Sequence, residues 1–228
     1  MHSLFMPVDT LNTTTYLHSV LQPNGQFDLQ WLMPVTGFET NGQPVTPPGF
    51  DQAYGLYLTI DASGILAQTT PTPIAGKYTS MNVTLWADPK NDAGTASSTV
   101  DSGAAFSGNT ANDIVLATGT IVSGQMSVDP TTGTRHATYV EKLTPTLDGA
   151  LLLGGSIKQG DLLTEQFTTQ ADQFVVESPG DGTSVNLVNG GSATVTLNSG
   201  DTILIAPHGL NLSSLGFLRH PHHPHPDS

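Results

Sequence analysis

The sequence predicts an all-β fold, an antiparallel β-sandwich or β-barrel with at most one short helix. Two observations favour strands: apolar and polar residues alternate over many short stretches, as expected of strands with one buried face. Turn dipeptides such as Asn24-Gly25 and Asn41-Gly42 separate these stretches, and successive turns are about 8 to 12 residues apart. The third observation is that helix signals are few. The spacing of strands and turns is typical of sandwiches and barrels and unlike alternating β and α units.

The clearest strand signal covers residues 78–87, where Met81, Val83 and Leu85 lie on one face. Residues 54–60 follow the same period, and Ser63-Gly64 predicts a tight reversal into residues 65–67. Further strands are predicted at residues 16–21, 26–32, 114–120, 125–128, 137–143, 173–177, 185–188, 193–197 and 202–206. Turns at Ser123-Gly124 and Asn189-Gly190 are expected to separate neighbouring strands, and the last three strands predict a meander.

One short helix is conceivable after Asp161, which could cap a segment with Leu162, Leu163 and Phe167 on one face. Two segments are predicted to be loops, residues 37–50 and residues 88–112. Loops as long as the second are uncommon unless they bind something or move, so it is a candidate functional edge; alternatively, it contains a weak strand.

Composition restricts the classes of function. Six Lys and Arg against nineteen Asp and Glu give a formal net charge of -13, which would repel the phosphates of nucleic acids. No apolar run approaches the roughly 18 residues of a membrane-spanning helix. The absence of cysteine excludes disulfides, thiolate zinc sites and a cysteine nucleophile. A Thr- and Gly-rich, Lys-poor composition is typical of exported β proteins, so we expect an extracellular or cell-surface location, although residues 1–7 do not resemble a signal peptide.

Residues 1–207 are predicted to form a single β domain, followed by a flexible His/Pro-rich tail at residues 208–228, where repeated prolines prevent regular structure. Four histidines in this tail are the predicted metal-ligating residues: His220, His222, His223 and His225. Neutral imidazole binds zinc, copper or nickel well, but an extended tail lacks the fixed geometry of most biological sites. The alternative is a solvated tail that binds metal only adventitiously.

The stretch from Asp88 to Gly94 has some features of a calcium loop, with Asp92 as a second carboxylate. It departs from the usual calcium-loop pattern because Lys90 stands where a ligand is needed. An Asp-Pro turn followed by an Asp/Gly turn is the simpler interpretation. No cofactor is predicted; calcium remains open if more distant residues supply ligands, and zinc remains open at the tail.

A different motif surrounds Asp101. The residues Asp101-Ser102-Gly103 match the core of aspartic proteases, and the apolar-Gly run at residues 151–155 resembles the element that supports such sites. These enzymes need two aspartates that share a proton, and the chain contains one such motif. A homodimer would have to supply the second aspartate, so a chance match is the favoured interpretation.

Three further stretches occur in a recognisable order: Tyr54-Gly55-Leu56-Tyr57, then residues 85–92, then residues 112–119 followed by Gly124. In this order the chain resembles, over about residues 50 to 128, the flocculation-associated exported proteins of exopolysaccharide-producing bacteria, which typically carry a Pro-Glu-Pro sorting signal. The 228 residues contain no Pro-Glu-Pro element. The resemblance implies a non-enzymatic surface or matrix protein, and it brings no catalytic residues.

The leading expectation is therefore a structural or adhesive protein of a biofilm or exopolysaccharide matrix, with self-association or matrix polysaccharide as its partner. Two alternatives remain. One is an enzyme, either an aspartic-type hydrolase at Asp101 or a β-barrel enzyme with an internal cavity. The other is a subunit of a self-assembling fibre, because strands with exposed edges pair readily.

Overall fold

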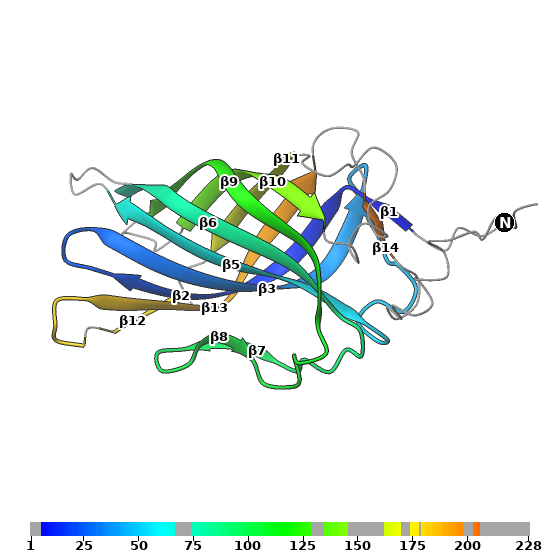
Figure 1. The fold of residues 1–228 in the computed structure, drawn as a ribbon, viewed down its shortest axis with the longest axis horizontal. Helices are drawn as coiled ribbons and strands as arrows, with labels where there is room; N and C mark the ends of the chain where they lie inside the picture. The colour runs from blue at the N-terminus through cyan, green and yellow to red at the C-terminus, as the bar shows by residue number, and fades with distance from the viewer. Residues whose placement is uncertain are drawn as a thin grey trace, which may run out of the picture.

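A computed structural model describes residues 6–66, 74–128, 135–145, 162–169, 174–177, 179–197 and 203–205. These residues form strands, turns and loops, and no helix occurs among them (Figure 1). The strands are β1 (Met6–Val8), β2 (Thr10–Leu21), β3 (Gln26–Thr40), β4 (Gln43–Val45), β5 (Gly55–Leu66), β6 (Ile74–Asp88), β7 (Ala96–Thr99), β8 (Gly103–Phe106), β9 (Ile114–Val128), β10 (Arg135–Pro145), β11 (Leu162–Thr169), β12 (Phe174–Glu177), β13 (Ser184–Leu197) and β14 (Ile203–Ile205). The predicted all-β, antiparallel fold is confirmed. No candidate for a membrane-crossing helix is present in the described part of the chain.

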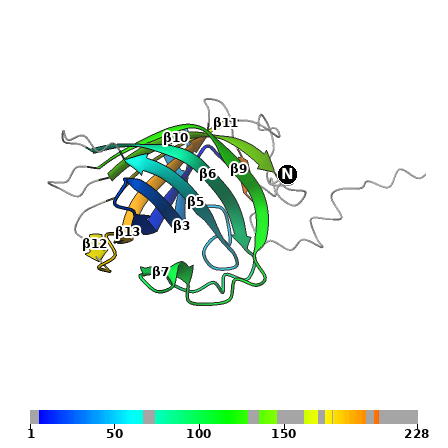
Figure 2. The same cartoon turned by 60° about the vertical axis from the view of Figure 1, so that its left-hand side comes forward.

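One strongly curved sheet dominates the structure. Its strands pair in the order β10-β9-β6-β5-β3-β2-β13, and every pairing is antiparallel. Strand β11 then pairs with β10 along one edge and with β13 along the other, so the pairings of these eight strands run in a continuous circuit around the core. Figure 2 shows how the sheet curls so that its parts face one another across the interior. Two small sheets, β1 with β14 and β7 with β8, accompany it.

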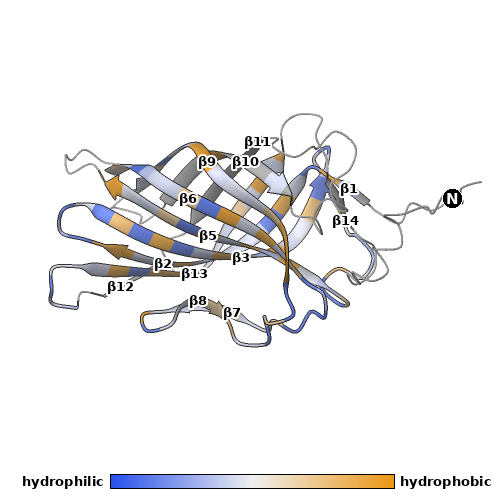
Figure 3. Ribbon diagram, viewed as in Figure 1, coloured by the Kyte–Doolittle hydropathy of each residue, from blue (hydrophilic) through white to orange (hydrophobic). Residues whose placement is uncertain are grey.

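The interior is filled by the side chains of alternate positions. Along β2, for example, buried and half-buried residues alternate, and Leu11 and Leu17 point inward. Figure 3 shows the resulting alternation of hydrophobic and hydrophilic bands along the strands. The largest fully buried side chains are Tyr54, Phe38, Leu17, Met33, Ile60, Met81, Val8 and Val188. A period-two pattern therefore gives one hydrophobic core, as the sequence indicates.

A second, smaller apolar cluster lies on the outer face of the sheet. The hairpin of β7 and β8 lies over this face, separate from the main sheet in both ribbon views (Figures 1 and 2). The buried members of the cluster are Leu32, Tyr57 and Ala96, with Tyr16, Trp86, Ala104 and Phe106 packed against them. We call these seven residues the outer-face cluster. The hairpin realises the alternative that residues 88–112 contain a weak strand, although the segment forms two.

Three predicted turns are wrong, because the chain runs straight through them. Ser63-Gly64 lies within β5, Ser123-Gly124 within β9 and Asn189-Gly190 within β13. At each place the ladder with a neighbouring strand shifts register, which is the mark of a β-bulge. A small or turn-favouring residue relieves the crowding in a bulge as well as in a turn, so the dipeptide alone does not distinguish the two. The predicted turns at Asn24-Gly25 and Asn41-Gly42 are confirmed, and Gly25 and Gly42 have positive φ.

Three other predictions also need correction. Residues 162–169 form strand β11 where a helix was considered, because pairing on both edges outweighs a weak helical pattern. The predicted loop at residues 37–50 is shorter, since β3 continues to Thr40 and β4 follows. The final strands do not form a meander: residues 185–188 and 193–197 belong to one strand, and β14 pairs with β1. The tail at residues 208–228 lies outside the described residues.

The core predicts a clear contrast between two aliphatic truncations. Ile60→Ala should lower the free energy of unfolding by about 2 to 5 kcal/mol, because Ile60 is fully buried in β5 and its loss leaves a cavity. Val122→Ala, at a side chain that is 58% exposed on β9, should change it by no more than about 0.5 kcal/mol. Urea denaturation followed by fluorescence measures both, and equal losses would contradict this assignment of the core.

Candidate functional site

Two aspartates meet where strands β6 and β9 end side by side. The ladder between these strands pairs Ala87 with Ile114, so the next residues outward, Asp88 and Asp113, lie opposite each other. Asp88 is the last residue of β6, and Asp113 directly precedes β9. Residues 89–112, which include the β7–β8 hairpin, therefore leave and re-enter the sheet at adjacent positions. We call this place the neck of the 89–112 loop.

A third aspartate joins this neck from the outgoing chain. A carboxylate oxygen from each of Asp88, Asp92 and Asp113 lies within 4.8 Å of those of the other two. In each residue one oxygen, Oδ2, accepts a hydrogen bond: Asp88 from the Ala93 amide at 2.9 Å, Asp92 from the Asn109 side chain at 3.2 Å, and Asp113 from the Tyr57 hydroxyl at 2.5 Å. These three bonds hold the carboxylates in fixed orientations. We call Asp88, Asp92 and Asp113 the carboxylate cluster.

The other oxygen of each carboxylate has no such partner. The Oδ1 atoms of Asp88, Asp92 and Asp113 are buried and accept no hydrogen bond. The side-chain oxygen and nitrogen of Asn112 are also buried, and the oxygen accepts and the nitrogen donates no hydrogen bond. The Asp88 side chain as a whole is only 3% exposed. Buried polar atoms are nearly always hydrogen-bonded, so this group of unsatisfied oxygens at one place requires an explanation.

Among the described side chains, no cation is paired with the carboxylate cluster. Lys77 and Lys90, the lysines whose side chains the structure describes, form no ion pair with these carboxylates. Burial and the nearby charges of Asp88 and Asp92 raise the pKa of Asp113 to about 6, although the Tyr57 hydroxyl opposes the shift. Burial and the Asp113 carboxylate raise the pKa of Tyr57 strongly, so its phenol stays protonated and donates.

Tyr57 joins the carboxylate cluster to the outer-face cluster. Its ring stacks on Trp86, with centroids 5.9 Å apart, and meets Phe106 of the hairpin edge-on at 4.8 Å. The far end of the hairpin region is held differently, because the Asn189 side chain accepts the Ser98 amide at 2.7 Å and donates to the Ser98 carbonyl at 3.3 Å. The hairpin is thus fixed by its neck, by aromatic packing and by one amide on β13.

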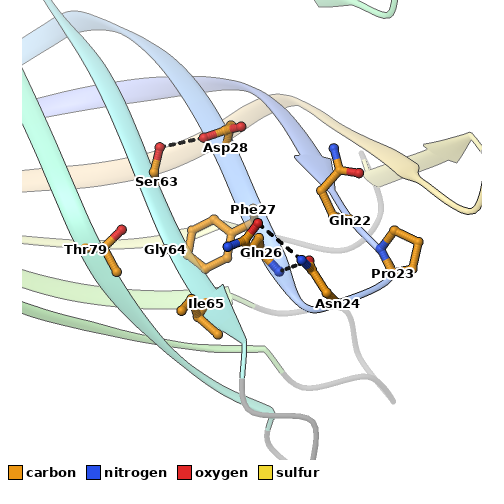
Figure 4. A pocket seen from close by; sticks show the side chains of 10 residues that line it. All are labelled: Gln22, Pro23, Asn24, Gln26, Phe27, Asp28, Ser63, Gly64, Ile65 and Thr79. Carbon is orange, nitrogen blue, oxygen red and sulfur yellow. Dashed lines mark hydrogen bonds between the residues drawn. The ribbon is translucent and has the colours of Figure 1, made fainter.

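A polar groove lies at the opposite end of strand β5. It has a volume of about 640 Å³ and is built around the β2–β3 turn and the end of β5. Figure 4 shows its lining residues: Gln22, Pro23, Asn24, Gln26, Phe27, Asp28, Ser63, Gly64, Ile65 and Thr79. Gly55 pairs with Asp88, whereas Ile65 lines the groove, so the two sites are separated by roughly 30 Å along the strand at about 3.3 Å per residue.

The local sequence explains the shape of the groove. Asn24 accepts a hydrogen bond from the Gln26 amide at 3.0 Å, which fixes the turn, and its side-chain nitrogen donates to the Gln26 side chain at 3.2 Å. Ser63 donates to Asp28 from the neighbouring strand. The bulge at Gly64 leaves no room for a side chain there, because a Cβ would lie 2.3 Å from the Lys77 carbonyl. Hydrogen-bonding side chains therefore line an open groove floored by glycine and Phe27.

The sites predicted from the sequence fall in different places. His220, His222, His223 and His225 lie outside the described residues. Asp101 lies exposed in the turn between β7 and β8, beside the hydrogen-bonded Thr99 and Ser102, and residues 151–155 lie outside the described part. Asp88 and Asp92, considered as part of a calcium loop, do come together, and the more distant partner is Asp113.

Sequence reasoning missed Asp113, Tyr57 and the groove. The predicted boundary at residue 114 was correct and the one at residue 87 lay one residue short, and together they would have placed Asp88 opposite Asp113 if the pairing of these two strands had been known. Comparisons with protein-family models, curated proteins and solved structures found no match to this chain.

The hairpin anchor gives a testable expectation. Asn189→Ala should speed amide hydrogen exchange across residues 96–106 and lower the free energy of unfolding by about 1 to 3 kcal/mol, because the buried Ser98 loses its partners. Asn82→Ala, at an exposed asparagine on β6, serves as the matched control. Unchanged exchange in the hairpin of the Asn189 variant would show that other contacts hold it in place.

Proposed function

We propose that this protein is a non-enzymatic, extracellular structural or adhesive component of a polysaccharide matrix, and that it holds the polysaccharide in the groove beside the β2–β3 turn. The groove carries this proposal. The sequence resemblance to flocculation-associated exported proteins supports the same setting, as does the Thr- and Gly-rich composition of the chain.

The lining of the groove matches the chemistry of sugar hydroxyls. Side-chain amides of Gln22, Asn24 and Gln26 offer donors and acceptors together, and a hydroxyl group on a sugar needs both. Asp28 adds an acceptor on the neighbouring face. Ile65, which is 48% exposed, offers an apolar surface for the C–H face of a sugar ring. A few convergent polar groups with an apolar contact are the usual composition of a ligand site.

Charge narrows the class of polysaccharide. The formal net charge of the chain is -13, and the groove itself contains the carboxylate of Asp28. No lysine or arginine lines it. A polymer rich in uronic acids or sulfate would be repelled, so the groove favours neutral sugars or amino sugars.

Substitutions in the groove test the proposal. Gln26→Ala and Asp28→Ala should each weaken binding to a neutral or amino-sugar polysaccharide by about 3- to 10-fold, the effect of one lost hydrogen bond. Affinity electrophoresis in gels containing the polymer, or calorimetry with its oligosaccharides, measures the change. Gln125→Ala, at an exposed glutamine on β9, is the matched control and should bind as the unaltered protein does.

Two outcomes would contradict the proposal. One is an unaltered protein that binds no polymer in a panel of neutral and amino-sugar polysaccharides. The other is equal binding by the Gln26 and Gln125 variants, which would place the contact elsewhere. Asp101→Asn belongs in the same panel, because loss of a hydrolytic activity in that variant would favour the aspartic-type alternative.

A further inference from the structure

The carboxylate cluster has two features of a cation site: carboxylate oxygens of its three residues lie close together, and one oxygen of each residue is buried without a hydrogen bond. We propose that Asp88, Asp92 and Asp113 bind one calcium ion at the neck of the 89–112 loop. The proposal does not rest on the groove or on the function assigned to it, since the two sites lie at opposite ends of β5.

The spacing of the oxygens fits a shared ion. Calcium binds oxygen ligands at about 2.3 to 2.6 Å, so two ligands on opposite sides of one ion are at most about 5 Å apart. One oxygen from each carboxylate lies within 4.8 Å of the others. The separation of the three carboxylates is therefore close to what one shared calcium ion requires.

The hydrogen bonding divides each carboxylate into two roles. The Oδ2 atoms are held by the Ala93 amide, the Asn109 side chain and the Tyr57 hydroxyl. The Oδ1 atoms are buried and unsatisfied. Metal sites typically show this division, in which one atom binds the ion and outer contacts fix the orientation of the ligand.

Two observations beyond the clustering of acids point to a ligand. Asp88 is only 3% exposed, yet its Oδ1 atom has no hydrogen-bond partner. Asn112, next to Asp113 in the chain, is half-buried, and its side chain lies beside Asp92, whose pKa it lowers; its amide oxygen is a further, neutral oxygen at this place. A pocket of about 220 Å³ is lined by Tyr57, Asp88 and Asn91 among others, so it borders one of the three carboxylate residues.

The donor set selects the kind of ion. Carboxylate and amide oxygens favour hard cations, whereas zinc, copper and nickel prefer imidazole or thiolate ligands. Magnesium demands near-octahedral geometry and usually keeps several waters, with one or two carboxylates as ligands. Three partly buried carboxylates on a loop neck suit calcium better. The histidines of the tail, by contrast, offer no oxygen site.

Binding at this neck has a structural consequence. The ion would connect Asp92, at the start of the loop, to Asp113, at its end. Tyr57 is hydrogen-bonded to Asp113 and contacts Trp86 and Phe106 with its ring, so fixing Asp113 would also fix these aromatic contacts. Calcium should therefore hold the hairpin against the outer face of the sheet.

Terbium luminescence on the full chain is the first measurement. Tb³⁺ replaces Ca²⁺ at oxygen sites, and the Tyr57 hydroxyl is 2.5 Å from one of the proposed ligand residues, so excitation of aromatic residues should sensitise bound Tb³⁺. Excess Ca²⁺ should displace the signal, with a Kd for Ca²⁺ of about 10⁻⁴ to 10⁻³ M, the range of extracellular modules. Zn²⁺, which would occupy the histidine tail, should not displace it. The absence of sensitised emission together with no calorimetric Ca²⁺ binding would overturn the proposal.

Variants distinguish a ligand role from a merely structural one. Asp92→Asn and Asp113→Asn should weaken Ca²⁺ binding by at least about 10-fold, and Tyr57→Phe, at a positioning residue, by about 10-fold. Asp101→Asn, at an exposed aspartate of the same loop, is the matched control. In chelator, Asp113→Asn should melt no lower than the unaltered protein because it removes charge repulsion, whereas in Ca²⁺ it should melt lower.

A competing account is that Asp88 and Asp113 share a proton and bind no metal. That account predicts melting temperatures that do not respond to Ca²⁺ in any of these proteins, and such a result would overturn the proposal. The calcium proposal predicts faster hydrogen exchange in residues 96–106 when the ion is removed by a chelator. This change should occur only in the unaltered protein and in Asp101→Asn.

Discussion

The fold depends on the pairing of every long strand along both of its edges. Strand β11 is the decisive member, because it pairs with β10 on one side and with β13 on the other and so completes the circuit around the core. Backbone groups in the eight strands are thereby hydrogen-bonded to neighbouring strands, and in β2, β3, β5 and β13 alternate side chains are directed into one interior. The unpaired edges that would otherwise favour aggregation are largely absent from this circuit.

The sequence contains most of the information about which residues form strands and which face the core. The alternation of Met81, Val83 and Leu85 correctly placed β6, and Asn24-Gly25 and Asn41-Gly42 correctly placed turns. Length was the part that could not be predicted, because Gly64, Gly124 and Gly190 each lie at or near a register shift within a strand of a dozen residues or more. A glycine accommodates either geometry, and the choice depends on partners that are distant in the chain.

The same limit explains what could be predicted of the carboxylate cluster. Asp88 and Asp92 were visible as a short acidic motif, and Lys90 counted against a calcium loop because a local pattern assigns every ligand to neighbouring positions. In the structure Lys90 is exposed, and the third carboxylate comes from Asp113 through the register of β6 and β9. Strand pairing is a non-local property, so neither composition nor spacing reveals it. The groove was missed for a similar reason, since it joins a turn on β2–β3 to a bulge on β5.

The two ends of strand β5 show how one scaffold supports different chemistry. At the end near Ile65, mostly uncharged side chains and the Asp28 carboxylate line an open groove, and their hydrogen bonds can exchange with those of a ligand at small cost. At the end near Gly55, three carboxylates are partly buried with their Oδ1 atoms unsatisfied, which is tolerable only if a cation or a shared proton offsets the repulsion. Tyr57 belongs to the second of these ends, where it connects the carboxylates to the aromatic residues beside the hairpin. Its hydroxyl serves the charged neck while its ring packs beneath the hairpin, so any change in the charge of the neck acts on the aromatic contacts as well.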